Sequence, residues 1–77
     1  MRFIDDRGNT YMSSTKKDLA NELFRISWAN IYAEDTLDWC KQCAVRIHEQ
    51  YGFLFEFTDE VSFIDEMIFY KLIREVN

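Results

Sequence analysis

The positions at which the backbone can reverse direction limit the fold most strongly, because the chain contains two glycines, Gly8 and Gly52, and no proline. Glycine adopts positive φ at little steric cost, so each glycine is expected at a tight turn or a helix end. Gly8 lies between two short apolar-containing runs, residues 2–5 and 9–12, which predicts a β-hairpin. With so few breaks in 77 residues, we expect a compact domain with short turns.

Two helical patterns follow the hairpin. The hydroxyl side chains of residues 13–15 can cap a first helix, which is predicted to end near residues 31–33 because apolar residues keep helical spacing that far. Asp35 or Thr36 can cap a second helix that runs to Tyr51 and stops at Gly52. The apolar positions of the first helix are Leu19, Leu23, Ile26 and Ile31, and the predicted inner face of the second is Leu37, Cys40, Ala44, Ile47 and Tyr51.

Residues 53–57, Phe-Leu-Phe-Glu-Phe, form the pattern most typical of a β-strand. Strand alternation would place the three phenylalanines on one face, with Leu54 and Glu56 on the other. Thr58 is expected to cap a third helix, and residues 72–76 either extend that helix or form a last strand, which we favour. The predicted class is α+β, one domain over 1–77, with a small mostly antiparallel sheet (hairpin, 53–57 and 72–76) packed with three helices in the order ββααβα(β).

Aromatic side chains are abundant for a chain of this length. They make up 17% of the residues, and each can bury roughly 150–250 Å², which suits the core of a small domain. Most phenylalanines are therefore expected inside. The aromatic residues expected to be exposed are Trp28, Tyr32, Trp39 and Tyr70.

The stretch "DWCKQC" at residues 38–43 resembles both a thioredoxin-type motif and half of a zinc site. A reactive thiol needs a helix N-terminus after a strand, whereas Cys40 is predicted one turn inside a helix beside Asp35 and Asp38. A structural zinc needs four ligands, and on a straight helix His48 would lie about 12 Å from Cys40. We therefore expect Cys40 and Cys43 to pack in the interior, with no metal and no cofactor.

Charge and residue types narrow the function classes. The net charge is −5, and the imbalance lies in residues 49–77, which hold seven acidic side chains against Lys71 and Arg74. This disfavours nucleic-acid binding and suits a basic protein surface. A single histidine and the lack of a glycine-rich phosphate loop point away from an enzyme. The start of the chain has no export signal and no run suits a membrane span, so a cytoplasmic location is expected.

Four stretches carry a resemblance that spans most of the chain: "MRFIDDRGNTY", "KKDLANELF", "CAVRIHEQYG" and "FIDEMIFYKLIREV". They resemble short hypothetical proteins carried by phages and conjugative elements of low-GC Gram-positive bacteria. This likeness implies a mobile-element origin and a bacterial cytoplasm, and it carries over no catalytic residue. Small acidic proteins of such elements are similar in kind to anti-CRISPR and anti-restriction inhibitors, some of which present carboxylates where a nuclease expects phosphates.

The functional expectation is therefore a non-enzymatic protein-binding module that inhibits a host defence nuclease with a basic surface. The alternative is a structural or regulatory interaction protein of the element, such as a homodimer, with no defence role. A third hypothesis is a metal- or thiol-dependent protein built on Cys40 and Cys43. The candidate partner-binding residues are Glu49, Glu56, Asp59, Glu60, Asp65, Glu66, Trp28 and Tyr32, with Glu75 as a further acidic candidate.

Overall fold

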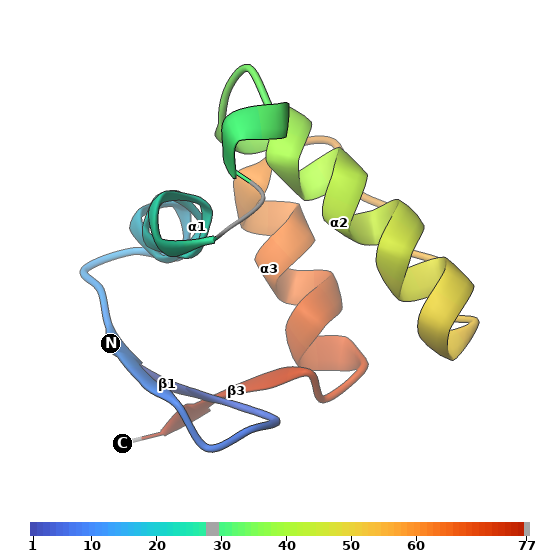
Figure 1. The fold of residues 1–77 in the computed structure, drawn as a ribbon. Coiled ribbons are helices and arrows are strands. Elements are labelled where there is room, and N and C mark those ends of the chain that lie inside the picture. Colours follow the sequence, from blue (N-terminus) through green and yellow to red (C-terminus); the bar gives the residue numbers. More distant parts are fainter. Residues whose placement is uncertain (28–29, 77) are drawn as a thin grey trace.

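Helices and a small sheet form two layers (Figure 1). The computed structural model describes residues 1–27 and 30–76. Within these residues the elements follow the order β1 (Arg2–Asp5), β2 (Thr10–Met12), α1 (Lys16–Ile26), the 3₁₀ helix η1 (Asn30–Tyr32), α2 (Thr36–Tyr51), α3 (Glu60–Phe69) and β3 (Ile73–Val76). The α+β class and the antiparallel sheet are confirmed.

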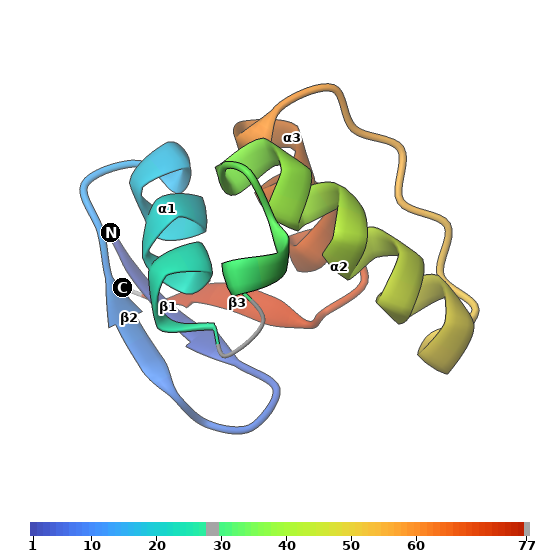
Figure 2. The same cartoon turned by 45° about the horizontal axis from the view of Figure 1, so that its top comes forward.

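The sheet has the strand order β2-β1-β3, and both pairings are antiparallel. The predicted hairpin is confirmed, with Gly8 at a φ of 87° in its turn. Asp5 holds the turn together, because its carboxylate accepts hydrogen bonds from the backbone N–H groups of Arg7 and Asn9 and from the hydroxyl of Tyr11. β3 confirms that the last residues form a strand. The helices lie on one side of this sheet, with α2 farthest from it (Figures 1 and 2).

Local capping explains where the helices begin. The side chain of Thr15 accepts a hydrogen bond from the Asp18 N–H, and that of Asp35 accepts one from the Asp38 N–H. Gly52 ends α2 in the left-handed conformation, as predicted. The third helix is capped by Asp59, which forms a capping box with Ser62, and not by Thr58 as predicted. A carboxylate is a strong acceptor for N–H groups at the positive end of a helix.

The predicted end of the first helix near residues 31–33 is wrong. α1 ends at Ile26, and Ser27 adopts an extended conformation. The apolar face of α1 has no more core to cover at this point, since Ile26 is already 51% exposed and Ile31 is 77% exposed. The chain instead continues to η1 and on to α2.

The predicted strand at residues 53–57 is also wrong, because this segment pairs with no strand. β3 occupies the edge of β1 that a further strand could have used. The segment lies beside the helices (Figure 2), and side chains hold it in place of a hydrogen-bonded ladder. Stacked rings run in the order Tyr51, Phe53, Tyr70, Phe55, with centroid separations of 5.4, 4.5 and 5.4 Å and interplanar angles of 10° or less. The predicted alternation still holds, since the three phenylalanines are half-buried while Leu54 and Glu56 are exposed.

The core lies where the three helices meet the sheet. Two predictions for α2 are wrong: Trp39 is only 7% exposed, whereas Tyr51, placed on the inner face, is 46% exposed. The ring of Trp39 contacts those of Phe24 and Phe63, each at 6.1 Å, which turns the buried face of α2 towards α1 and α3. The buried cluster consists of Phe3, Leu19, Ala20, Trp39, Cys40, Phe63, Ile64 and Ile73.

Candidate functional site

A mixed apolar and acidic surface surrounds Leu54, which is 62% exposed. On one side, Leu54, Glu56, Glu66 and Phe69 line a depression of about 310 Å³. On the other side, Leu54 lines a second depression of about 300 Å³ with Val45 and Glu49. The two depressions adjoin at Leu54, which lines both of them. We call this surface the Leu54 face and define it by Val45, Glu49, Leu54, Glu56, Glu66 and Phe69.

Helical spacing and the corrected conformation of residues 53–57 build this face. Val45 and Glu49 are four residues apart on α2, and Glu66 and Phe69 are three apart on α3, so each pair shares one side of its helix. The outward positions of the 53–57 segment lie between the two pairs. The backbone of Leu54 is tied to the end of α3, because its carbonyl oxygen accepts a hydrogen bond from the Tyr70 hydroxyl at 3.0 Å.

Three of the predicted acidic residues, Glu49, Glu56 and Glu66, therefore meet on one surface. Sequence reasoning placed Leu54 on the outward side of its segment but named none of the apolar members as a contact residue. It grouped Phe69 with the phenylalanines expected mostly inside, whereas Phe69 is 73% exposed, and Val45 is 58% exposed. Phe69 could have been recognised from its place at the end of a helix, directly before Tyr70. Val45 gave no comparable signal, because an isolated exposed valine on a helix is common.

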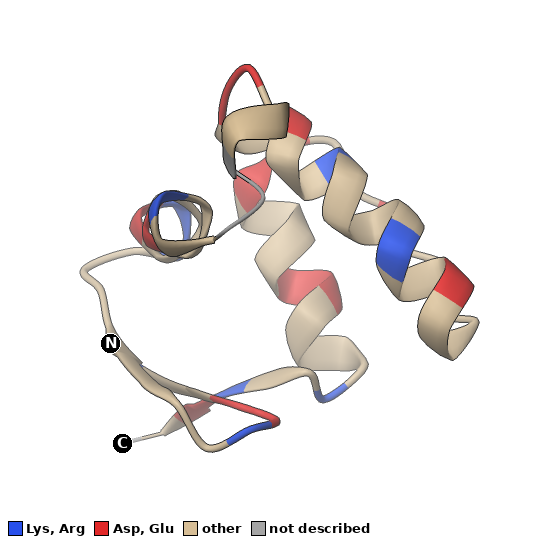
Figure 3. Cartoon of the chain, in the orientation of Figure 1, with Lys and Arg blue, Asp and Glu red and all other residues tan. Residues whose placement is uncertain are grey.

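The other predicted carboxylates lie elsewhere, and two of them, Asp65 and Asp59, have local partners. Asp65 forms an ion pair with Lys16 of α1, with 2.6 Å between Nζ and Oδ1. Asp59 caps α3, and hydrogen bonds from the backbone and side chain of Ser62 lower its pKa. Glu60 lies in the first turn of α3. Figure 3 shows acidic positions at the start and in the middle of this helix. Glu75 is an exposed residue of β3. These residues do not join Glu49, Glu56 and Glu66 in one patch.

The two aromatic candidates differ in what the structure describes. Tyr32 is 67% exposed in η1, so its predicted exposure is confirmed, but it does not line the Leu54 face. Trp28 lies outside the described residues. Tyr70, also expected to be exposed, is half-buried in the ring stack.

The cysteines are buried thiols in a helix interior. Cys40 is fully buried and Cys43 partly buried, and neither forms a disulfide. Burial raises the pKa of Cys40 to about 12, with a further contribution from the acidic groups of Glu60 and Asp35. Burial also raises the pKa of Cys43 to about 11, although Arg46 opposes the shift. A thiol with so high a pKa is a poor nucleophile and a poor metal ligand at neutral pH.

Within residues 1–27 and 30–76, no group of three or more His, Cys, Asp or Glu side chains is arranged to hold a metal ion. No helix in the same residues is both long enough and apolar enough to cross a membrane. Comparison with known proteins found no matching family model, curated protein or solved structure.

Proposed function

We propose that this chain is a non-enzymatic protein-binding module of a mobile genetic element, and that it inhibits a host defence nuclease of the CRISPR-effector kind. The Leu54 face is the proposed contact surface. The observation that carries the proposal is the gathering of three exposed apolar side chains and three carboxylates on one face. The assignment of the partner to defence rests on the sequence resemblance.

The composition of the Leu54 face suits a protein partner. Leu54, Phe69 and Val45 are between 58% and 73% exposed, so a partner could remove a large apolar area from water. Exposed leucine, phenylalanine and valine side chains next to carboxylates suit the combination of apolar anchors and polar residues found at protein interfaces.

The charge of this face indicates the kind of partner. Glu49, Glu56 and Glu66 place three negative charges on it, and no lysine or arginine lines the two depressions. A nuclease channel is basic because it holds phosphates, and such a channel attracts a preorganised anionic surface. Carboxylates would supply attraction and orientation, and the apolar side chains would supply most of the affinity.

The experiment is affinity capture from a lysate of a defence-competent Gram-positive host, followed by mass spectrometry, with and without competing duplex DNA. Three baits are compared: the natural chain, the Leu54→Arg variant and the Ile31→Arg variant. Ile31 is the matched control because it is an exposed aliphatic residue, 77% accessible, outside the Leu54 face. The captured nuclease is then purified and its DNA cleavage measured with each protein.

The proposal predicts a stoichiometric nuclease that DNA displaces, that the Ile31→Arg bait retains and that the Leu54→Arg bait loses. DNA cleavage by the nuclease should be inhibited by the natural chain and by the Ile31→Arg variant, but not by the Leu54→Arg variant. Capture of a nuclease that is unaffected by Leu54→Arg would refute the role of the face. Capture without inhibition of cleavage would refute the inhibitor function.

The same exposed apolar side chains favour a second candidate, an interaction protein of the element that forms a homodimer. Self-association through the Leu54 face would bury Leu54 and Phe69 against their copies. Light scattering over a range of concentrations tests this: a dimer that Leu54→Arg converts to monomer supports the candidate, and a strictly monomeric natural chain rejects it.

A further inference from the structure

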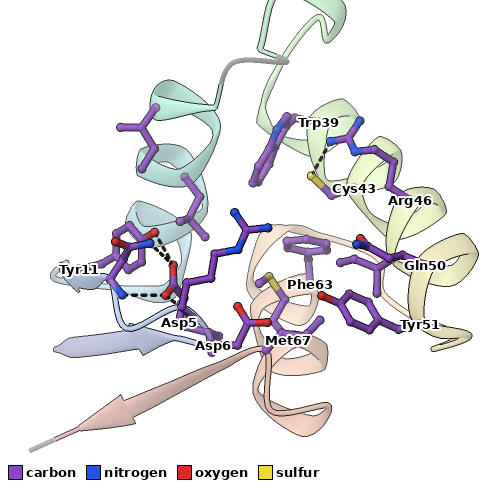
Figure 4. A pocket seen from close by; sticks show the side chains of 17 residues that line it. Asp5, Asp6, Tyr11, Trp39, Cys43, Arg46, Gln50, Tyr51, Phe63 and Met67 are labelled. Atoms are coloured by element: carbon purple, nitrogen blue, oxygen red, sulfur yellow. Dashed lines mark hydrogen bonds between the residues drawn. The ribbon is translucent and has the colours of Figure 1, made fainter.

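A cavity of about 410 Å³ opens between the hairpin turn and the three helices (Figure 4). Its size falls within the range of small-molecule sites, roughly 300–1,000 Å³. Trp39, Phe63 and Met67 form an apolar lining, while Gln50 and Tyr51 lie across the space from the hairpin residue Asp5. This cavity shares no residue with the Leu54 face, so it is independent of the function proposed above.

A buried polar group at this cavity has no protein partner. Trp39 is 7% exposed, and its indole Nε1–H finds no hydrogen-bond acceptor in the described part of the chain. Buried N–H groups are almost always paired, and an unpaired one is destabilising. Less than 1 Å² of this nitrogen is accessible, so an occupant of the cavity contacts the apolar ring of Trp39 and not its N–H.

Two guanidinium groups lie at the opening. Arg7 comes from the hairpin turn and Arg46 from α2, and both are exposed. Neither forms an ion pair with a described residue; Arg46 donates only to the sulfur of Cys43, at 3.2 Å, which is a weak acceptor. Arginine binds carboxylate, sulfonate and phosphate groups in a bidentate manner, so both side chains are suited to an anion.

Two carboxylates, those of Asp5 and Asp6, also line the cavity, and they differ in their hydrogen bonding. The oxygens of Asp5 are hydrogen-bonded within the hairpin. They accept from the backbone N–H groups of Arg7 and Asn9, the side-chain amide of Asn9 and the hydroxyl of Tyr11. Asp6 accepts no hydrogen bond from a described side chain and would repel an anion. Removal of its charge should therefore strengthen anion binding, a sign opposite to the effect of removing an arginine.

We propose that this cavity binds an anionic amphipathic small molecule, with a flat apolar body against Trp39, Phe63 and Met67 and one anionic group at Arg46 and Arg7. The shared chemistry is an aromatic or alicyclic carboxylate, sulfonate or phosphate.

The probe is anilinonaphthalene sulfonate, with N-phenylnaphthylamine as the uncharged analogue. Binding is followed on protein carrying ¹³C-methyl methionine, because Met67 lines the cavity while Met12 is 76% exposed and does not. The sulfonate should shift the Met67 methyl signal, leave the Met12 signal in place and raise the melting temperature. The uncharged analogue should bind at least about tenfold more weakly, since it lacks a charge-assisted hydrogen bond.

Matched variants locate the anionic group. Arg46→Gln and Arg7→Gln should each weaken sulfonate binding about tenfold. Lys41→Gln on α2 and Arg74→Gln on β3 remove the same charge from exposed residues outside the cavity and should leave the affinity unchanged. Asp6→Asn should tighten binding. All five residues are exposed, so these variants are expected to fold.

Three results would overturn the proposal. The first is a Met67 signal that does not move at saturating probe. The second is equal weakening by Arg46→Gln and Lys41→Gln, which would indicate attraction by overall charge alone. The third is loss of binding in Leu54→Arg with no loss in the arginine variants, which would place the probe on the Leu54 face.

Discussion

Tyr70 should decide whether residues 53–57 stay in place, because this segment has no strand partner. Its ring lies between those of Phe53 and Phe55, with centroid separations of 4.5 and 5.4 Å. Its hydroxyl donates to the Leu54 carbonyl oxygen at 3.0 Å. Replacing Tyr70 by Ala removes these three contacts and the edge-to-face contact with the Phe69 ring at 4.9 Å, whereas replacing it by Phe removes the hydrogen bond alone.

The expected magnitudes follow from these contacts. An aromatic pair contributes about 1 kcal/mol beyond its buried area, and a neutral hydrogen bond about 1 kcal/mol. Tyr70→Ala should therefore lower the free energy of unfolding by at least about 3 kcal/mol and Tyr70→Phe by about 1 kcal/mol. In a domain of this size, about 3 kcal/mol corresponds to a fall in melting temperature on the order of 15 °C.

Urea denaturation and limited chymotrypsin digestion measure the two consequences. Tyr70→Ala should lower the urea midpoint and speed cleavage after Phe53 and Phe55. Tyr32→Ala is the control, because Tyr32 is 67% exposed in η1, and its loss should change stability by less than about 0.5 kcal/mol. If Tyr70→Ala is no less stable than Tyr70→Phe, and is cleaved no faster, the ring stack does not hold the segment.

Three further predictions concern the core, the hairpin and the thiols. Phe63→Ala should lower the free energy of unfolding by about 3–5 kcal/mol, because Phe63 is fully buried. Phe69→Ala is the control, because Phe69 is 73% exposed, and it should change the free energy of unfolding by less than about 0.5 kcal/mol. Equal urea midpoints of the two variants would contradict this. Partial burial acts to raise the pKa of Asp5, but the hydrogen bonds it accepts, chiefly from Asn9, outweigh burial and lower it below 3.8. The ionised Asp5 carboxylate therefore stabilises the fold at pH values above its unfolded pKa, and this stabilisation is lost as pH falls through the lowered folded pKa. The stability difference between the natural chain and Asp5→Asn should shrink from about pH 6 to about pH 3. A difference that stays constant with pH would refute this. Cys40 and Cys43, with pKa values of about 12 and 11, should react with iodoacetamide at neutral pH at least about tenfold more slowly in the folded chain than in urea, and equal rates would contradict their burial.

Short-range patterns predicted the turns and most helix boundaries. Gly8 and Gly52 have the positive φ values that their positions indicated, and α2 has the bounds predicted for the second helix. These features depend on backbone sterics and on hydrogen bonds between residues at most four apart, which sequence contains directly. The cap of α3 was misassigned by one residue because Thr58 and Asp59 are both good caps.

The candidate surface could be predicted only in part. The sequence indicated an acidic C-terminal region, and Asp59, Glu60, Asp65 and Glu66 were all candidates for the same binding surface as Glu49 and Glu56. Tertiary packing separates these residues, since Asp65 forms an ion pair with Lys16 of α1, while Glu66 lies beside the 53–57 segment. The sequence of α3 does not indicate that α1 and the 53–57 segment pack against different sides of this helix.

What the sequence determined by itself is the fold class, the hairpin, the starts of the first two helices and the alternation of burial along residues 53–57. Only the tertiary structure decided that this segment is not a strand, that Trp39 is buried, and that Glu49, Glu56 and Glu66 share a face with Leu54. The physical reason is the range of the interactions. Caps, turns and periodicity act between near neighbours, whereas strand pairing and ring stacking depend on which distant surfaces compete for the same partner: β3 occupies the edge of β1, and the rings of Tyr51 and Tyr70 hold residues 53–57 against the helices instead.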